Sequence, residues 1–397
     1  MGSPGKRVLI IVENLPVPFD KRVWNEATTL SAAGYTVSVI CPTGKGYELR
    51  REVLDNIAIY RHPLPLEGSS VFGYFREYAA ALWWEFLLSV RVLRERGFDV
   101  IHACNPPDLI FIIGSFYKLF GKKFLFDHHD INPELYEAKF GRKGMFYRII
   151  VLLERWTFKA ADISLATNQS YRDIAINRGG MNPANVYIVR SGPNLDKFHP
   201  VAPREELKRG FSYLVGYVGV MGKQEGLDYL LRAVQCIVRE KGRSDILFVL
   251  IGSGTEFITL QKYAEELGVG GVVRFTGRIS DDELMAYLCT ADVCVNPDIA
   301  TPMNDKSTMN KIMEYMALGK PIVQFDLTEG RRSAGDASLY ARKNDAEDFA
   351  DKILELLADP GRRADMGNLG KNRVEQELAW TFSAAVLLKA YANIFAP

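Results

Sequence analysis

The sequence predicts an α/β protein with two domains, each built around a parallel sheet. The chain has 397 residues, which is more than a single hydrophobic core usually serves. Short β-branched runs alternate with helical patterns along its whole length, and this alternation is typical of parallel sheets that are covered by helices. The alternation starts afresh after Asn194. We therefore expect two Rossmann-like domains in succession.

The first domain is expected to span residues 1–199. Its candidate strands are largely apolar, as strands covered by helices on both faces should be. The predicted strands are Val8–Val12, Thr36–Cys41, Ile57–Arg61, Val100–Ala103, Lys123–Asp127, Ile163–Ala166 and Val186–Val189. The predicted helices are Trp24–Ala33, Tyr74–Arg96, Leu109–Phe120, Met145–Ala160 and Tyr171–Arg178. Because these helices fill the gaps between strands, parallel pairing is the expected arrangement.

The second domain is expected to span residues 200–379, and one of its helix boundaries is clearly marked. Ser280 and Glu283 have the spacing of a capping box, which predicts a helix that starts at Asp281. The predicted strands are Leu214–Gly219, Ile246–Ile251, Val272–Thr276, Val293–Asn296 and Pro321–Gln324. The predicted helices are Gly226–Lys241, Glu256–Leu267, Asp281–Thr290, Thr308–Leu318, Ala346–Ala358 and a last one over about 382–395.

The composition is that of a globular protein and gives no electrostatic case for nucleic acid as a partner. Hydrophobic residues make up 48% and charged residues 24%, and the net charge is only +1. The five cysteines show no CxxC spacing and no paired histidine. This pattern favours reduced thiols in a cytoplasmic protein over a disulfide framework or a structural zinc site.

The longest apolar stretch runs from about Tyr78 to Leu93 and contains Trp83 and Trp84. It falls short of the roughly 20 apolar residues of a membrane span, and Glu85 interrupts it. A core helix is the favoured interpretation. The alternative is a surface that rests on a bilayer, which would place the protein in peripheral contact with the inner face of a membrane.

The most informative segment runs from Asn304 to Val323, where polar residues lead directly into a short apolar helix. The polar part consists of Lys306, Ser307, Thr308, Met309 and Asn310. Lys311 follows in the first turn, and a helix N-terminus offers unpaired N–H groups and a partial positive charge to a phosphate. Glu314, one turn further, is placed to accept hydrogen bonds from sugar hydroxyls. The pattern predicts a nucleotide-sugar site; the alternative is an amphipathic helix whose Glu314 is merely solvated.

This segment resembles the donor-binding motif of family 4 glycosyltransferases, whose fold is of the GT-B type. The resemblance implies two Rossmann-like domains that face each other across a cleft. Residues 1–199 would form the acceptor side, completed by a C-terminal helix within 380–397, and residues 200–379 would bind the donor. The implied enzyme is a retaining, hexosyltransferase-like glycosyltransferase, and UDP is the expected nucleotide of its donor.

The resemblance also implies partners for the protein. The acceptor would be a hydroxyl of a sugar or a lipid-linked sugar, in the synthesis of a surface polysaccharide or glycoconjugate. No metal or other cofactor is expected, because in this fold protein cations and a helix dipole stabilise the leaving diphosphate. The sequence itself shows no cluster of His, Asp and Glu with the spacing of metal ligands.

Two glycine-containing turns follow strands of the second domain, at the sheet edge where ligands of open α/β sheets bind. Gly219 and Gly222 lie at the end of the strand Leu214–Gly219, where the missing side chain lets the backbone approach a ligand. The resemblance assigns Gly254 to the nucleotide and the backbone beside Arg278 to the base. Tight connections between a strand and a helix explain the glycines equally well.

Three positions depart from the pattern of the family. Val220 and Glu225 stand where relatives carry Arg and Lys, and Lys306 stands where they carry the first of two glutamates. Lys311 is the strongest candidate to replace the lost positive charge, because the first helical turn combines its charge with free N–H groups. Further cations nearby are Lys223, Lys306, and Arg331 with Arg332 in a predicted loop.

Two adjacent histidines, His128 and His129, follow the predicted strand Lys123–Asp127 of the first domain. A metal site would need further ligands, and none is indicated by the sequence. The family has a functional histidine after this strand, so the resemblance assigns a catalytic role to one of them. The neighbouring Asp130 favours His129, with His128 buried beside it.

Asp20, Lys21 and Arg22 lie at the start of the first predicted helix, after a segment stiffened by two prolines. We expect this helix start to face the cleft, which favours a role in binding the acceptor or a phosphate. The alternative is that the segment only caps the helix.

Two further functions stay open at the level of the sequence. Val220, Glu225 and Lys306 are consistent with a relative that binds nucleotide but is catalytically weak. A sugar-nucleotide epimerase of GT-B fold is the second alternative. Release of free nucleotide only when an acceptor is present would argue against the epimerase.

Overall fold

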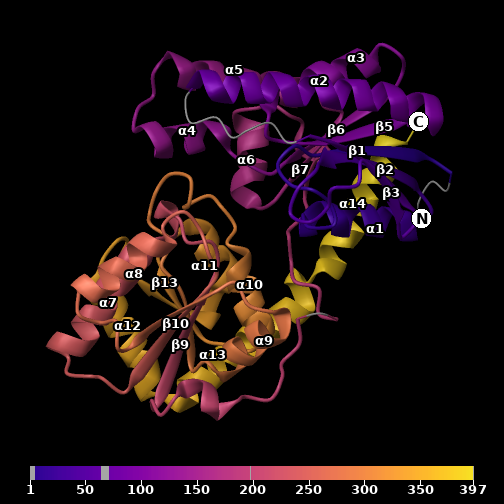
Figure 1. Cartoon of the computed structure of the whole chain (residues 1–397). Coiled ribbons are helices and arrows are strands. Elements are labelled where there is room, and N and C mark those ends of the chain that lie inside the picture. The colour runs from indigo at the N-terminus through magenta and orange to yellow at the C-terminus, as the bar shows by residue number, and fades with distance from the viewer. Residues whose placement is uncertain (1–4, 64–70, 197, 397) are drawn as a thin grey trace. The chain divides into compact units, whose positions relative to one another are not determined.

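The computed structural model of the chain describes residues 5–63, 71–196 and 198–396, and it has the α/β fold class that the sequence predicts (Figure 1). It divides into two compact units, residues 1–191 with 383–397 and residues 192–382. Hydrogen bonds explain these borders. The N–H of Trp380 donates to the carbonyl of Pro193 at 3.0 Å, within unit 2, while the N–H of Arg190 donates to Ser383 Oγ at 3.0 Å, within unit 1.

Unit 1 contains an eight-stranded sheet with the order β3-β4-β2-β1-β5-β6-β7-β8. All neighbouring strands are parallel except β3 and β4, which form an antiparallel pair at one edge. The strands are β1 (Arg7–Ile11), β2 (Thr36–Pro42), β3 (Arg51–Leu54), β4 (Ile57–His62), β5 (Val100–Cys104), β6 (Lys123–His128), β7 (Ile163–Ala166) and β8 (Val186–Ile188). Every residue of β5 is buried, as expected for a parallel strand covered on both faces.

Helices cover both faces of this sheet: α2, α3 and α5 lie on one side, and α1 and α14 on the other (Figure 1). The helices of unit 1 are α1 (Lys21–Ala32), α2 (Val71–Glu95), α3 (Phe111–Lys118), α4 (Asn132–Phe140), α5 (Met145–Ala160) and α6 (Gln169–Asn177), with most of α14 (Trp380–Ile394). Tyr391 on α14 packs edge-on against Tyr35, at 5.4 Å between ring centroids. Among the described residues, no helix combines the length and the apolar character needed to cross a bilayer.

Unit 2 contains a six-stranded, fully parallel sheet with the order β11-β10-β9-β12-β13-β14. Its strands are β9 (Tyr213–Val218), β10 (Ile246–Ile251), β11 (Val273–Gly277), β12 (Val293–Asn296), β13 (Ile322–Phe325) and β14 (Ser338–Ala341). Its helices are α7 (Leu227–Gln235), α8 (Phe257–Glu266), α9 (Asp281–Thr290), α10 (Asn310–Ala317), α11 (Thr328–Ala334), α12 (Ala346–Ala358) and α13 (Pro360–Arg373). The strand order reverses between β9 and β12, which lie side by side although β10 and β11 separate them in sequence.

The predicted capping box is confirmed: Ser280 Oγ accepts the N–H of Glu283 at 3.3 Å, and Glu283 Oε2 accepts the N–H of Ser280 at 3.4 Å. The predicted helix Gly226–Lys241 is α7 continued by a π-helical segment, Cys236–Glu240. The predicted helix Thr308–Leu318 begins later, at Asn310.

Five elements escaped the sequence prediction, namely β3, β14, α4, α11 and α13. They are short or polar: no residue of β3 is buried, and α13 carries few apolar side chains after its N-cap, Asp359. Arg331 and Arg332, expected in a loop, lie in the helix α11. There Arg331 pairs with Asp326 at 2.8 Å, and Arg332 contacts Glu329 at 2.6 Å.

A carboxyl group is buried on α2, on the side that faces the sheet. Glu85 has no exposed surface, and neither of its oxygens has a hydrogen-bond partner among the described residues. Burial, together with the charge of nearby Glu13, raises the pKa of Glu85 to about 8. Glu85 therefore holds a proton at neutral pH, which lets the helix pack as an apolar element.

This buried proton makes the stability of unit 1 depend on pH. Between about pH 5 and pH 8 the folded state holds a proton on Glu85 that the unfolded chain releases, so the contribution of Glu85 to stability is present at low pH and is lost as pH rises through 8. The slope is at most about 1.4 kcal/mol per pH unit. We expect Glu85→Gln to remove this loss, measured by urea unfolding with tryptophan fluorescence at a series of pH values.

Glu48→Gln, at an exposed position of unit 1, serves as the matched control. It should keep the pH dependence of the wild type. If Glu85→Gln and Glu48→Gln give the same pH profile, Glu85 does not bind the proton.

Candidate functional site

Chemistry-bearing side chains collect at the carboxyl edge of each sheet, close to the point where the strand order reverses. Ligands of open α/β sheets bind at such points. In unit 2 we define the α10 cluster as Tyr217, Asp298, Lys311, Glu314 and Tyr315. In unit 1 we define the β6 cluster as Arg22, Glu26, His102, Asp127 and His129.

The start of α10 is the main feature of the α10 cluster. The side chain of Met309, at the N-cap position, makes no capping hydrogen bond within the described part of the chain. The N–H groups of the first turn of a helix have no acceptor inside that helix, so this end of α10 is suited to bind an anion. Glu314 follows one turn later and is partly exposed.

Lys311, in the first turn of α10, is engaged with a carboxylate that the sequence prediction missed. Its Nζ lies 3.1 Å from Asp298 Oδ1 and 3.2 Å from Oδ2, and 4.9 Å from the centroid of the Tyr217 ring. Burial lowers the pKa of Lys311, but the charge of Asp298 more than offsets it, so the net pKa lies above the ordinary value and the amine keeps its proton. Lys311 was expected to contribute an uncompensated positive charge; the structure shows half of a largely buried ion pair.

Tyr315 fixes the position of α10 on the sheet. Its hydroxyl accepts the N–H of Val218 at 2.9 Å and donates to the carbonyl of Val295 at 3.3 Å. One buried hydroxyl therefore joins α10 to the ends of β9 and β12, the two strands at the reversal point. The position of Lys311 and Glu314 follows from this attachment.

The glycine turn after β9 is closed by contacts within unit 2. Gly219 has φ 157°, and a Cβ there would lie 2.7 Å from the Tyr217 hydroxyl. Glu225 accepts the N–H of Gly222 at 3.1 Å, and burial raises its pKa. A Cβ on Gly254 would collide with the carbonyl of Met221, so Gly254 is required for packing between two loops whatever else it does.

The remaining predicted residues of unit 2 fall into two sets: those that directly precede α10, and those in the loops after β9 and β11. Lys306, Ser307 and Thr308 are partly buried and precede the helix, and the Ser307 hydroxyl donates to the carbonyl of Met303 at 2.9 Å. Arg278 is exposed after β11, and Val220 is exposed in the glycine turn. The structure thus gathers the predicted residues from Lys306 to Glu314 in one segment.

The ion pair of Lys311 has a consequence for stability. Lys311→Met would leave Asp298 buried without a partner, and breaking a buried pair in this way costs about 3–5 kcal/mol. We expect the double variant Lys311→Met/Asp298→Asn to recover most of that loss. Urea unfolding followed by circular dichroism measures both effects.

Lys223→Met, at an exposed position of the glycine turn, should change the free energy of unfolding by no more than about 0.5 kcal/mol. A Lys311→Met variant as stable as this control would show that the pair contributes nothing to folding.

The centre of the β6 cluster is an ion pair between Arg22 and Asp127. The guanidinium donates to both carboxylate oxygens, at 2.7 and 3.0 Å, and to the carbonyl of Val189 at 2.7 Å. Arg22 Nη2 also lies 3.2 Å from Glu26 Oε1. Burial alone would raise the pKa of Asp127, but the charge of Arg22 holds it well below its ordinary value. Arg22, predicted to face the cleft on the acceptor side, is mostly buried and joins α1 to β6.

His129 lies beside this pair. Its Nε2 is 2.5 Å from Asp127 Oδ2 and 3.0 Å from Arg22 Nε. Because the ionised carboxylate can only accept, the short contact favours the tautomer with the proton on Nε2. Arg22 Nε, which can only donate, then gives its hydrogen to Asp127 Oδ2 at 3.0 Å. Asn105, at the end of β5, holds the loop by accepting the N–H of His129 at 2.7 Å. His128, in contrast, is fully buried, with its ring 5.1 Å from that of Phe158.

Behind His129 lie two further buried groups, Glu26 and His102. Burial and the charge of Asp127 raise the pKa of Glu26 well above its ordinary value. Burial lowers the pKa of His102, whose Nδ1 is 2.9 Å from the hydroxyl of Tyr391 on α14. The cluster therefore combines one ionised pair with two neutral groups.

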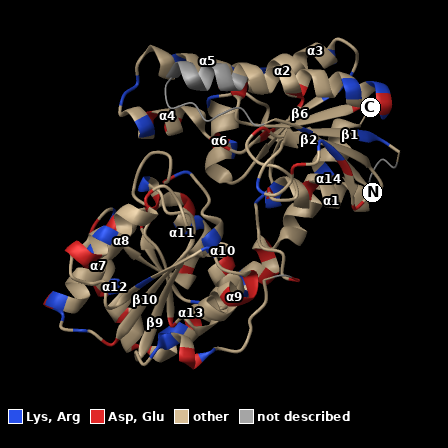
Figure 2. Cartoon of the chain, viewed as in Figure 1, with Lys and Arg blue, Asp and Glu red and all other residues tan. Residues whose placement is uncertain are grey.

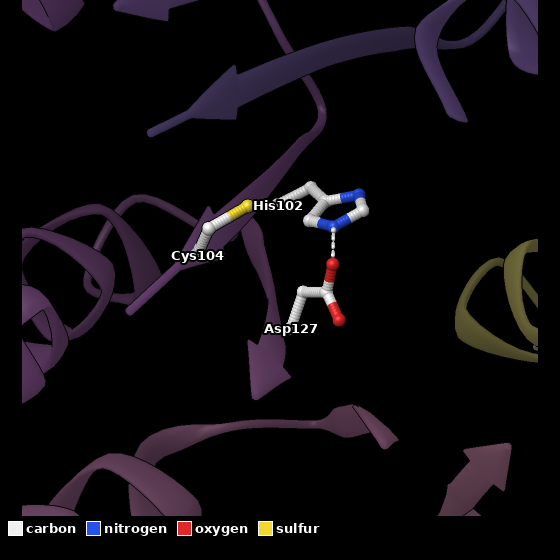
Figure 3. Close-up of side chains that lie close together, drawn as sticks. All are labelled: His102, Cys104 and Asp127. Carbon is white, nitrogen blue, oxygen red and sulfur yellow. Dashed lines mark ion pairs between the residues drawn. The ribbon is translucent and has the colours of Figure 1, made fainter. Parts of the chain in front are cut away.

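Two groups of side chains here have ligand atoms close enough to hold a metal ion, a grouping that the sequence did not indicate. They are His102 with Cys104 and Asp127, and Glu26 with Asp127 and His129; within each group all ligand atoms lie within 4.8 Å of one another. Figure 3 shows the His102 ring and the Asp127 carboxylate pointing toward each other, with the sulfur of Cys104 beside them. Two features oppose a metal: Arg22 already neutralises Asp127, and burial raises the pKa of Cys104 well above its ordinary value, which keeps the thiol protonated.

The other two predicted residues of the first helix have different positions. Asp20 Oδ1 accepts the N–H of Val23 at 3.1 Å and is the N-cap of α1, the alternative that the sequence left open. Lys21 is exposed. Arg22 is the residue of this segment that belongs to the β6 cluster.

Sequence reasoning missed Asp298, Asn105, Glu26 and His102. A weak signal existed for the first two: each comes at or just after the end of an apolar strand, Asp298 after β12 and Asn105 after β5. Glu26 and His102 lie inside apolar runs, and a lone polar residue there indicates a buried partner without saying which one.

The whole chain was compared with known families, proteins and structures. Residues 212–359 match the family described as glycosyl transferases group 1, and residues 20–197 match glycosyltransferase family 4. A D-inositol 3-phosphate glycosyltransferase of Corynebacterium aurimucosum is 31% identical over 248 residues, which are 59% of this chain and 57% of that protein. The chain thus spans little more than half the length of the curated relatives it matches.

Solved structures match over almost the whole chain. Sucrose-phosphate synthase from Thermosynechococcus elongatus has a TM-score of 0.82 at 20% identity, covering 98% of this chain and 99% of that one. The Anabaena protein HepE, in complex with UDP and glucose, has a TM-score of 0.72 at 14% identity, covering 97% and 99%. At these identities the likeness shows the fold.

Proposed function

The chain belongs to the family 4 glycosyltransferases and has the GT-B fold, and from this premise we propose that it transfers a sugar from a nucleotide-diphosphate donor to an acceptor hydroxyl. The observation that carries the proposal is the start of α10, where a helix end without a side-chain cap and Lys311 precede Glu314 by one turn. Phosphates at the helix end and sugar hydroxyls at Glu314 account for both features. The other predicted donor-binding residues (Gly219, Gly222, Gly254, Arg278 and the segment from Lys306 to Asn310) are part of this proposal.

The donor is proposed to be a UDP-sugar. HepE, which shares the fold, was solved with UDP, and this supports the choice without deciding it. Because Asp298 neutralises Lys311, the helix dipole and N–H groups must contribute much of the attraction for the diphosphate. Lys306 and Lys223 are the proposed additional cations.

Glu314→Gln tests the donor site. The substitution keeps the shape of the side chain and removes a charged acceptor, which should weaken binding of the nucleotide sugar by about 1.5–3 kcal/mol, or roughly tenfold to a hundredfold. Isothermal titration with UDP-glucose, UDP-galactose, GDP-mannose and ADP-glucose identifies the donor first and then compares the variants.

The control for this titration is Glu266→Gln, an exposed glutamate on α8, which should bind as the wild type does. Equal donor affinity in Glu314→Gln and Glu266→Gln would remove Glu314 from the site.

The reaction is proposed to proceed with retention of anomeric configuration and without a metal, with His129 as a catalytic residue. The acceptor is proposed to be a sugar or a lipid-linked sugar of a polysaccharide or glycoconjugate. The His129 side chain is 14% exposed, and in the favoured tautomer its Nε2–H is directed to Asp127. Its Nδ1 is then the ring atom left to interact with a ligand.

One assay covers these points. The donor identified by titration is incubated with an acceptor in excess EDTA, and proton NMR follows the anomeric signal of the product. We expect turnover to persist in EDTA, because protein cations and a helix dipole stabilise the leaving diphosphate, and the first product to carry the donor's own configuration. Loss of activity in EDTA that Mg²⁺ or Mn²⁺ restores would contradict the metal-free reaction.

The same assay separates the two alternatives. Binding without turnover would indicate a catalytically weak relative. The departures from the family pattern at Val220, Glu225 and Lys306 favour this alternative. Release of free nucleotide without any acceptor would instead favour a sugar-nucleotide epimerase.

A further inference from the structure

One face of unit 1 exposes many large apolar side chains. They come from α2 (Trp83, Trp84, Leu87), from α3 and its end (Ile112, Phe116, Leu119, Phe120) and from α5 (Met145, Phe146, Ile149, Leu152, Trp156). We call this set the apolar face. The exposed fraction reaches 82% for Leu119 and 71% for Met145, so these side chains are not the edges of a buried core. Exposed apolar surface of this extent marks an interaction site.

The three helices form one continuous surface. Phe86 on α2 packs edge-on against Phe116 on α3, at 5.2 Å between ring centroids. Phe111 on α3 packs in the same way against Trp156 on α5, at 5.8 Å. The view in Figure 1 agrees, since α2, α3 and α5 lie on the same side of the sheet of unit 1.

The exposed charged side chains of α3, of α5 and of the α4–α5 connection are of one sign. Exposed basic side chains on α3, on α5 and around the α4–α5 connection are Lys118, Lys139, Arg142, Lys143, Arg148, Arg155 and Lys159. The acidic side chains within residues 111–160 are buried or partly buried, namely Asp127, Asp130, Glu134, Glu137 and Glu154. Figure 2 shows the blue segments where α4 leads into α5. An anionic partner is therefore favoured.

This combination discriminates between the partners that such a face could have. The core of a protein–protein interface is depleted of Lys and other charged residues. A helix that lies in a bilayer interface has Trp, Phe and Leu on one face and Lys and Arg beside them, and the basic residues pair with anionic lipid headgroups. The aromatic side chains and the seven exposed cations match the second description.

We propose that the apolar face of α2, α3 and α5 docks on the surface of a bilayer that contains anionic phospholipid. The apolar side chains insert among the acyl chains near the headgroups, and the surrounding lysines and arginines contact the lipid phosphates. The inference concerns unit 1 alone and does not rest on the proposed transfer reaction. The sequence left peripheral membrane contact as an alternative for the stretch around Trp83. The present proposal assigns this contact to a defined surface on three helices.

The test is co-sedimentation of the full chain with vesicles. One set contains phosphatidylglycerol and phosphatidylcholine in equal parts, and the other contains phosphatidylcholine only. We expect binding to the anionic vesicles, a fall in binding as salt is raised, and little binding to the neutral ones. Equal binding to both sets would contradict the role of the cations, and no binding to either would overturn the proposal.

Variants assign the binding to the apolar face. Arg142→Ser/Arg148→Ser should weaken partitioning roughly thirtyfold, since each charge near an anionic surface contributes about 1 kcal/mol. Met145→Ser/Phe146→Ser should weaken it at least tenfold through lost insertion. The matched control is Ile258→Ser/Leu369→Ser, which removes two exposed apolar side chains of unit 2 and should bind as the wild type does.

Two further measurements keep the result interpretable. The melting temperatures of the variants should equal that of the wild type, because all of the substituted side chains are exposed. Light scattering tests whether a second copy covers the face instead. A dimer in solution that Met145→Ser/Phe146→Ser converts to monomer, without any vesicle binding by the wild type, would replace the bilayer by a second copy of this chain.

Discussion

The arrangement at the edge of the first sheet depends on the neutralisation of one buried charge. Asp127 stays ionised in the interior only because Arg22 binds both of its oxygens, and the same guanidinium reaches the carbonyl of Val189. One side chain thus ties α1 to β6 and to the segment after β8. The orientation of His129 follows from this pair, since its Nε2 can only donate to Asp127. Arg22, which the sequence analysis assigned to the acceptor side, thus has a structural role, and it supports the residue proposed to be functional.

Unit 2 also contains a buried carboxylate that is neutralised by a cation from a helix. Lys311 neutralises Asp298 below the start of α10, while Tyr315 anchors the helix to β9 and β12. Both sheets thus place a carboxylate at the edge where ligands bind and pair it with a cation from a helix. Paired in this way, Lys311 has less charge to offer an anion.

The periodicity of the sequence was sufficient to predict the fold class and most strands. A short apolar β-branched run such as β10 is typical of a parallel strand that helices cover on both faces. The helix α10 begins two residues later than predicted, after a turn in which the Ser307 hydroxyl donates to the carbonyl of Met303. The pairs Lys311–Asp298 and Arg22–Asp127 could not be predicted. Arg22 and Asp127 lie 105 positions apart in the sequence, and Lys311 and Asp298 lie 13 positions apart across the connection between β12 and α10. Neither spacing follows a helix or strand period, so no periodic pattern predicts these contacts. The segment around Glu314 could be proposed as a site from the sequence because its residues are contiguous.

The path of the chain through the two units has a consequence for its synthesis. Tyr391, which hydrogen-bonds His102 in the interior of unit 1, leaves the ribosome only after all of unit 2 has been made. Until then the nascent first unit lacks one of the two helices that cover this face of its sheet, while unit 2 (residues 192–382) already has every strand of its own. The unit that is translated first is therefore completed last, and its uncovered sheet is what a chaperone would meet during elongation.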